Sequence, residues 1–491
     1  MHRVWHDGGR RDAIAMGQEI STDKFTDEDD RVFRERLRDE TKILKRWFEE
    51  RAFDHDDRFT VGLELEAWLL DENHIPTPRN EEFLSVANDP DIVEELSKFN
   101  FEINSPPKGL GAGTFSETEN DLNRIWAKCV RAGEIINVKP IAIGIMPTVR
   151  DEMLQPHWMS DTNRFHALNA ELFRRRNGAP LHICIEGHDE LDYECNNIML
   201  EAACTSLQSH LKINQENAVR LYNASIIAAA PLVAASANSP YLYGKCLWAE
   251  TRIPAFEQST ELESFRDVEG RNVLRVTLGR GYIRNSMLEL FIRNLDYPNL
   301  LPALSDTSNK LPHLRLQNGT VWRWVRPIVG FDKDLNPHLR IEHRVIPAGP
   351  SMIDTTANLM LCHGLTLSLG LAESPPEQHL PFEDARQNFY ACARNGLDAQ
   401  IIWNGNRMGV RSLLLNMLLP TARKALSDQG VSEEELVKYF DNVIVPRIET
   451  GQNGTVWQRS FIEKNGRNYQ VLTERYAELQ AAGTPVHTWP V

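Results

Sequence analysis

Apolar and acidic residues alternate in the stretch VGLELEAWLL, residues 61–70. Successive side chains of a β-strand point to opposite faces, so the pattern predicts a strand with Glu64 and Glu66 on one face and Leu63 and Leu65 on the other. The two carboxylates would stand roughly 7 Å apart along the strand, which is close enough to hold cations between them. On their own, however, acids at such positions are commonly just a solvated face.

The hydrophobic pattern along the rest of the chain predicts helices and strands in irregular order. A helix is expected from Thr26 to about residue 50, because Thr26 and Asp29 have the spacing of a capping box and apolar residues recur at helical intervals. Residues 340–372 read as a strand, a Pro/Gly loop and a helix. Further strands are expected at 99–107, 139–147, 179–187 and 204–214, and further helices at 117–137 and 215–235. Without regular β-α-β spacing, this order predicts an α+β fold with an antiparallel-rich sheet.

The pattern also suggests how the chain is divided. Residues 1–25 read as a loose lead-in, residues 26–375 as the main α+β domain, and residues 376–491 as a mainly helical C-terminal part packed on that domain. The Pro-rich stretch ESPPEQHLP, residues 373–381, is the linker candidate. The longest apolar run, residues 224–237, is too short to span a bilayer and contains a proline.

The charge balance narrows the class of partner. The formal net charge is −15, which argues against nucleic acid and anionic membranes, because both need a basic footprint. Small-molecule substrates stay open, since arginines clustered in a cleft can bind anions on an acidic protein. Seven scattered cysteines without a C-x-x-C pair indicate reduced thiols, and the N-terminus lacks an apolar h-region. We therefore expect a cytoplasmic protein, and we leave a homo-oligomer open.

Polar residues interrupt several of the apolar, strand-like runs. They are Glu102 in FEIN, Gln208, His210 and Lys212 in LQSHLKIN, and Glu342 between Arg340 and Arg344 in RIEHR. Carboxylates are the ligands that Mg²⁺ prefers, and arginine forks match phosphate or carboxylate groups. Taken singly, RIEHR has a structural alternative as a ladder of cross-strand ion pairs, and His210 has one as a structural histidine. Taken together, these residues favour a site for a nucleotide and a metal.

Five motifs carry a resemblance to a known family. VGLELEAWLLD, FEINSPP, TSLQSHLKIN, AASANSPYLYGKCLWAETR and LRIEHRVIPAGPSMIDTTANLML occur in the order seen in carboxylate–amine ligases of the glutamate–cysteine ligase family, and resemble its second bacterial group. The last motif is also similar to the R-x-E-x-R…D-x-x-A-N stretch of glutamine synthetase. The resemblance runs from about residue 58 to 430. It implies a glutamine synthetase/guanido kinase-like catalytic domain, with a curved antiparallel-rich sheet and helices on one face.

The resemblance also implies roles for individual residues. The implied Mg²⁺ ligands are Glu64, Glu66, Glu102, His210 and Glu342. The implied nucleotide-binding residues are Gln208, His210 and Arg340. Arg344 would lie near the transferred phosphate, and Arg252, in WAETR, would bind phosphate or the substrate carboxylate, so that both are candidate catalytic residues. Arg164, in TNRFHAL, would bind the substrate with Arg252.

The activity that the resemblance implies is that of an ATP- and Mg²⁺-dependent ligase, with Mn²⁺ as another usable metal. Glutamate or a similar amino acid would be joined to an amine such as cysteine through an acyl phosphate, giving an amide of the γ-glutamyl type, as in glutathione biosynthesis. Two alternatives stay open: a phosphotransferase on the same fold, similar to the guanidino kinases, and a catalytically silent nucleotide-binding relative. The sequence has no P-loop motif and no kinase signature, which agrees with a fold that holds ATP through metals on a sheet.

Overall fold

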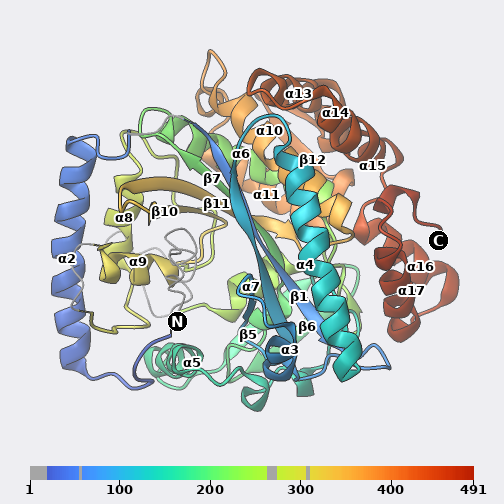
Figure 1. Cartoon of the computed structure of the whole chain (residues 1–491), viewed down its shortest axis with the longest axis horizontal. Coiled ribbons are helices and arrows are strands. Elements are labelled where there is room, and N and C mark those ends of the chain that lie inside the picture. The colour runs from blue at the N-terminus through green and yellow to red at the C-terminus, as the bar shows by residue number, and fades with distance from the viewer. Residues whose placement is uncertain (1–18, 55–57, 263–273, 306–309) are drawn as a thin grey trace, which may run out of the picture.

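A seven-stranded antiparallel sheet lies at the centre of the protein (Figure 1). The structure is a computed structural model and describes residues 19–54, 58–262, 274–305 and 310–491. The strands follow the order β10-β11-β7-β1-β3-β2, and β4 pairs with β1. Their bounds are β1 Thr60–Leu70, β2 Ile92–Glu94, β3 Asn100–Gly109, β4 Lys139–Ile141, β7 Ser206–Ile213, β10 Val325–Phe331 and β11 Pro337–Pro347. The prediction of an α+β fold with an antiparallel-rich sheet is confirmed.

Helices cover one face of this sheet. Ser209 of β7 lies 3.3 Å from the His363 ring, and His343 of β11 lies 3.1 Å from the carbonyl oxygen of Ser225. These two strand residues alternate with the predicted site residues, so the site residues point away from the helices. The covering helices are α4 Thr114–Ile136, α6 Ala218–Ser236 and α10 Met352–Gly370, and α11 Phe382–Asn395 packs on α6. The opposite face is therefore the one that presents the polar side chains.

The helix α6 is long and apolar enough to cross a membrane by length and composition alone. In the folded protein, however, 89% of its apolar window is buried. It contacts α10, α11 and β11, and nearly every residue from Leu221 to Ser236 is shielded from solvent. Its hydrophobicity is accounted for by its place in the core.

The helix α2, Asp27–Glu49, begins where the sequence predicts. The Thr26 hydroxyl accepts a hydrogen bond from Asp29 N at 3.2 Å, and the Asp29 carboxylate accepts one from Thr26 N at 2.8 Å. This reciprocal pair is a capping box, which satisfies two backbone donors at the start of the helix. Along its length α2 packs on α8, Leu288–Arg293, and α9, Pro312–Gly319, on the left in Figure 1.

Several strands differ from the prediction, β4 and β10 among them. The strand expected at 139–147 ends at Ile141, because the next backbone groups bond to other segments: Ala142 N donates to Gln480 at 3.0 Å and Gly144 O accepts from Thr205 N at 3.0 Å. The strand β10 was not predicted, because every residue of VRPIVGF is buried and no alternation marks it. Its proline is compatible with its position at the edge of the sheet.

The C-terminal residues 376–491 are mainly helical and contact the sheet domain. Arg447 forms an ion pair with Asp354 of α10 at 2.8 Å, and both side chains are buried. The Tyr476 hydroxyl donates to the carbonyl oxygen of Ala142 at 3.0 Å. The division at residue 375 stays a prediction. Of the predicted lead-in, residues 1–18 lie outside the described ranges, and residues 19–25 form neither helix nor strand.

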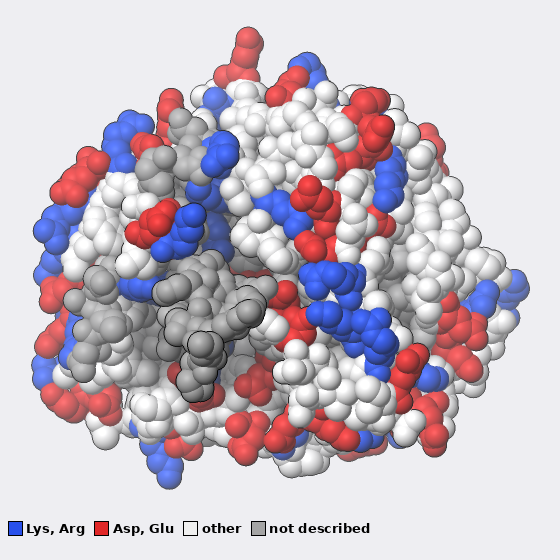
Figure 2. Space-filling model, viewed as in Figure 1, with Lys and Arg blue, Asp and Glu red and all other residues white. Residues whose placement is uncertain are grey.

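The remaining elements are shorter or lie at the periphery. The other strands are β5 Leu181–Glu186, β6 Glu190–Cys195, β8 Tyr241–Leu242, β9 Lys245–Cys246, β12 Gln400–Trp403 and β13 Asn406–Gly409. The other α-helices of the described ranges are α3 Asn80–Ala87, α5 Asn163–Arg175, α7 Arg252–Ser259, α12 Val410–Leu413, α13 Leu419–Asp428, α14 Glu433–Glu435, α15 Val445–Thr450, α16 Gly454–Asn465 and α17 Tyr469–Ala481. Figure 2 shows acidic and basic side chains interspersed over the viewed face, so the net negative charge is not gathered there.

Candidate active site

The strand register brings the predicted carboxylates together on the face of the sheet opposite α6 and α10. Glu66 of β1 is paired with Glu102 of β3, and Glu64 is paired with Gln208 of β7. The Gln208 amide donates to Glu66 at 2.9 Å and lies 3.5 Å from Glu102. The second oxygen of Glu66 accepts from Ser206 N at 2.6 Å. Residues that are far apart in the sequence thus form one carboxylate cluster, with its acids on β1 and β3 and the Gln208 amide on β7.

A cationic group adjoins this cluster on β10 and β11. The guanidinium of Arg326 donates to both oxygens of Glu342, at 3.1 and 2.8 Å. Arg344 donates to Glu342 at 2.7 Å and to the Gln208 side-chain oxygen at 2.6 Å. Arg344 therefore links the cationic group to the carboxylate cluster, whereas both oxygens of Glu342 are already occupied by arginine. Arg326 was not among the predicted site residues, because the strand that carries it was not predicted.

His210 lies between these two groups. It is paired with Glu342 in the register, and its Nε2 atom is 3.2 Å from the Glu64 carboxylate. Neither ring nitrogen makes a hydrogen bond of good geometry to any residue that the structure describes, although both are buried. Buried polar atoms are almost always satisfied. The unsatisfied nitrogens beside a carboxylate fit a metal or another ligand at this position.

A further carboxylate, Glu95, joins the cluster from the loop after β2. Oxygens of Glu66, Glu95 and Glu102 all lie within 4.8 Å of one another. The sequence reading missed Glu95, because the residue follows a three-residue strand and has no alternation to mark it. The only signal is that β2 pairs with the part of β3 that carries Glu102, and this pairing is not visible in the sequence.

The electrostatics of the cluster favour a cation. Burial and the neighbouring carboxylates of Glu64 and Glu95 raise the pKa of Glu102 well above its usual range. Burial, together with Glu66 and Glu201, raises the pKa of Glu95 to about 8. Burial also raises the pKa of Glu66, despite the opposing effect of an arginine. Several buried acids thus compete for too little positive charge, and their hard oxygen atoms fit Mg²⁺.

Next to the cationic groups, the pKa values of Glu342 and Glu64 are lowered instead of raised. Burial would raise the pKa of Glu342, but Arg326 and Arg344 more than offset it and lower the pKa. Burial likewise opposes ionisation of Glu64, but His210 and Arg344 together more than offset it and lower the pKa of Glu64. The site is therefore divided into an ion-paired side and a side with uncompensated negative charge.

Two further predicted residues lie around the cluster. Arg164, near the start of α5, is half-buried, and although burial lowers its pKa, Glu95 and Glu201 act in the opposite direction. It is therefore within electrostatic reach of the carboxylates. Arg340 precedes Glu342 by two residues on β11, so that it lies on the same face and is paired with Lys212 of β7.

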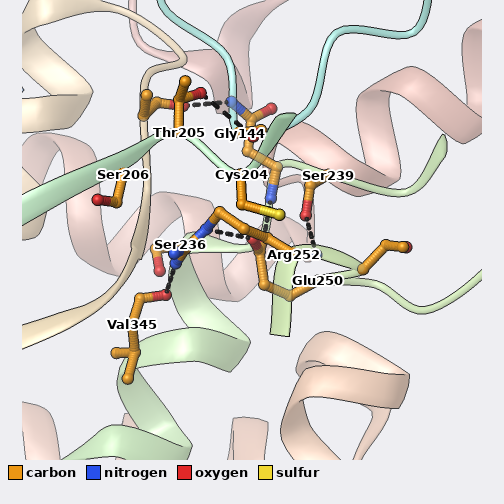
Figure 3. Close-up of polar contacts among 12 residues, drawn as sticks. Gly144, Cys204, Thr205, Ser206, Ser236, Ser239, Glu250, Arg252 and Val345 are labelled. Carbon is orange, nitrogen blue, oxygen red and sulfur yellow. Dashed lines mark hydrogen bonds and ion pairs between the residues drawn. The ribbon is translucent and has the colours of Figure 1, made fainter. Parts of the chain in front are cut away.

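Arg252 is placed differently from the other predicted residues. It is the first residue of α7, and its guanidinium donates to Glu250 at 3.2 Å and to the carbonyl oxygens of Arg344 and Val345 at 3.0 and 2.6 Å (Figure 3). Two of these contacts are to backbone carbonyls of β11, and the third is to the side chain of Glu250. The predicted role of Arg252 in binding phosphate or substrate stays a prediction, and none of these three contacts is to the carboxylate cluster.

Comparisons with known proteins agree with this fold. A model of the family described as glutamate-cysteine ligase family 2 matches residues 60–474. A search of curated proteins found no significant match. Among solved structures, glutamate–cysteine ligase from Francisella tularensis in complex with AMP has a TM-score of 0.51 at 9% identity, covering 87% of this chain and 89% of that one. At this identity the likeness shows the fold alone, and it confirms the predicted fold class.

Two other solved structures are more distant. A bifunctional glutathione synthetase from Pasteurella multocida has a TM-score of 0.49 at 12% identity, covering 87% of this chain and 52% of that one. The prokaryotic ubiquitin-like protein ligase PafA, in its complex with Pup, has a TM-score of 0.36 at 12% identity, covering 87% of this chain and 76% of that one.

Proposed function

The chain belongs to glutamate-cysteine ligase family 2, and from this premise we propose that it is an ATP- and Mg²⁺-dependent carboxylate–amine ligase. The substrates would be glutamate or a similar amino acid and an amine such as cysteine, and the product an amide of the γ-glutamyl type. One observation carries the proposal: a buried carboxylate cluster, in which the pKa values of Glu66 and Glu102 are raised, lies directly beside the guanidinium of Arg344.

The chemistry requires activation of a carboxylate. An amine does not displace oxygen from a carboxylate anion, but it does displace phosphate from an acyl phosphate. Transfer of the ATP γ-phosphoryl group to the carboxylate supplies that leaving group, and such transfers depend mainly on positioning and on neutralised charge. Magnesium, when bound, would supply most of the neutralising charge on the phosphates.

The position of each residue in the site suggests whether it would bind metal or contact the transferred phosphoryl group. Glu64, Glu66, Glu102 and His210 would hold metal, and Glu95 adds a carboxylate that the family resemblance did not assign. Glu342 forms ion pairs with two arginines. To act as the predicted metal ligand, it would have to bind the metal while keeping these ion pairs. Arg344 would face the transferred phosphoryl group.

Nucleotide and amino-acid binding would involve the residues around the cluster. Gln208 and Arg340 would face the nucleotide. Arg164 would meet the carboxylate of the amino acid, because it is a half-buried cation close to the metal-binding acids. A cytoplasmic location and a homo-oligomeric state stay predictions.

A substrate screen tests the proposal. The protein is incubated with ATP, Mg²⁺, glutamate and a panel of amines that includes cysteine, and both phosphate release and product mass are followed. Phosphate together with an amide is the expected result. A stable phosphorylated product would instead indicate a phosphotransferase, and bound ATP without turnover across the panel would indicate a silent relative. The Glu66→Gln variant serves as the negative control, and Glu94→Gln, which changes an exposed glutamate, as the matched positive control.

A further inference from the structure

The strand β11 contains an irregularity next to the cationic side of the site. Its pairing with β7 runs regularly to His343, which faces Ser209, and resumes at Ile346, which faces Leu207. One more residue is used on β11 than on β7, so Arg344 and Val345 form a β-bulge. A bulge leaves backbone groups outside the ladder, bends the strand and re-aims a side chain.

The backbone of this bulge is held on two sides. The amide of Arg344 donates to the carbonyl oxygen of Trp324 at 2.9 Å. The carbonyl oxygens of Arg344 and Val345 both accept from one Nη2 atom of Arg252, at 3.0 and 2.6 Å (Figure 3). The Arg252 guanidinium also lies 5.4 Å from the centre of the Trp324 ring. The backbone carbonyl of Trp324 thus holds the donor of the bulge, and the guanidinium of Arg252 holds its two acceptors.

Arg252 is itself held in a fixed orientation. Its Nε atom donates to Glu250 at 3.2 Å, and the side chains of both residues are essentially inaccessible to solvent. The other oxygen of Glu250 accepts from Asn238 N at 2.9 Å, and the amide of Arg252 donates to the Ser239 hydroxyl at 3.3 Å. The segment from 238 to 252 is thereby tied to β11 through this guanidinium.

We propose that Arg252 is a positioning residue, which holds the β11 bulge so that the side chain of Arg344 reaches Gln208 and Glu342. This role rests on the proposed function, because it matters for catalysis only if Arg344 faces the transferred phosphoryl group. It differs from direct binding of phosphate by Arg252, because the contacts that define its orientation are to Glu250 and to backbone carbonyls. Lysine should not replace it, since a single ammonium lacks the fork needed to meet Glu250 and two carbonyls together.

Kinetics of the Arg252→Lys variant give the first test. Because misplacement of a catalytic group by about 1 Å can cost about 100-fold, we expect kcat to fall about 10- to 100-fold with the KM for ATP and for the amino acid little changed. In an Arg344→Lys background, the same substitution should cost less than about 3-fold, because the two residues then act as one unit. Arg386→Lys, which changes an arginine in a surface ion pair, is the matched control. A raised KM with unchanged kcat, or additive effects in the double variant, would overturn the proposal.

Hydrogen exchange gives a second test that does not depend on turnover. In Arg252→Lys, amide exchange should rise at least about 10-fold around residues 343–346 and stay unchanged in β1. If that variant does not fold, Glu250→Gln loosens the same guanidinium while leaving it in place, and a smaller rise at the same amides is expected. Unchanged amide exchange at residues 343–346 would contradict the proposal. If the wild-type protein is inactive in the substrate screen, the proposed function is wrong. The exchange experiment still tests whether Arg252 holds the bulge, because it does not depend on turnover.

Discussion

The carboxylate of Glu95 should destabilise the protein when no metal is present. A pKa of about 8 in place of the ordinary 4.5 corresponds to at most about 5 kcal/mol, at about 1.4 kcal/mol per pKa unit. Because Glu95 is only half-buried and shares its proton affinity with Glu66 and Glu102, we reduce this to about 1–3 kcal/mol. Replacing it by Gln removes the charge with little change of shape, so Glu95→Gln should stabilise the metal-free protein at pH 8.

The size of this effect depends on pH. A carboxyl whose pKa is raised by folding favours the folded state below the unfolded pKa, and this contribution is lost as the pH rises through the folded pKa. The wild-type protein should therefore lose stability between about pH 4.5 and pH 8 relative to Glu95→Gln. At pH 5 the two proteins should differ by less than about 1 kcal/mol.

Urea unfolding in EDTA, at pH 5 and at pH 8, measures this difference. Repeating it at pH 8 with Mg²⁺ should reverse the order, because the wild-type protein gains more from the cation. Glu94→Gln is the matched control, since Glu94 is exposed and the acids that influence its pKa are Glu19 and Glu81 rather than the cluster. If Glu95→Gln is less stable than wild type in EDTA at pH 8, or if Glu94→Gln behaves the same way, the account of the cluster is wrong.

Three other substitutions test separate parts of the structure. Glu342→Ala leaves Arg326 and a second arginine buried without their partner, so it should cost about 3–5 kcal/mol in urea unfolding, whereas Glu342→Gln should cost clearly less. His210→Ala should weaken Mg²⁺ binding at least about 10-fold in calorimetry; an unchanged affinity would remove His210 from the metal site. Arg447→Met breaks the buried ion pair with Asp354 and should cost about 3–5 kcal/mol; a loss below about 1 kcal/mol would show that this pair does not hold the C-terminal part in place.

The sequence reading succeeded where the signal is local. Alternation within one strand predicted that Glu64 and Glu66 share a face, and the capping box predicted the start of α2. The same alternation grouped Glu342 with Arg344, which are hydrogen-bonded at 2.7 Å. These features depend only on the geometry of a single strand or a single helical turn.

The features that were missed depend on contacts between distant segments. Glu95 has no periodic neighbours and enters the cluster only through the pairing of β2 with β3. Arg326 lies on β10, which is buried throughout and gives no alternation. For Arg252 the residue type was noticed, but its partners are backbone carbonyls of β11. No sequence pattern specifies which carbonyl a side chain will meet.

The order of strands in the sheet has a consequence for how the protein is made. β1 pairs with β7, and β7 pairs with β11. The strand β11 completes the site, and it can pair with β7 only after the ribosome has synthesised the chain beyond residue 347. Until then the edge of β7 that β11 will cover is unpaired, and an open edge of this kind recruits other chains. Tyr476 then bonds to Ala142, beside β4. Nascent chains that stall between β7 and β11 should therefore be the form of this protein most dependent on chaperones.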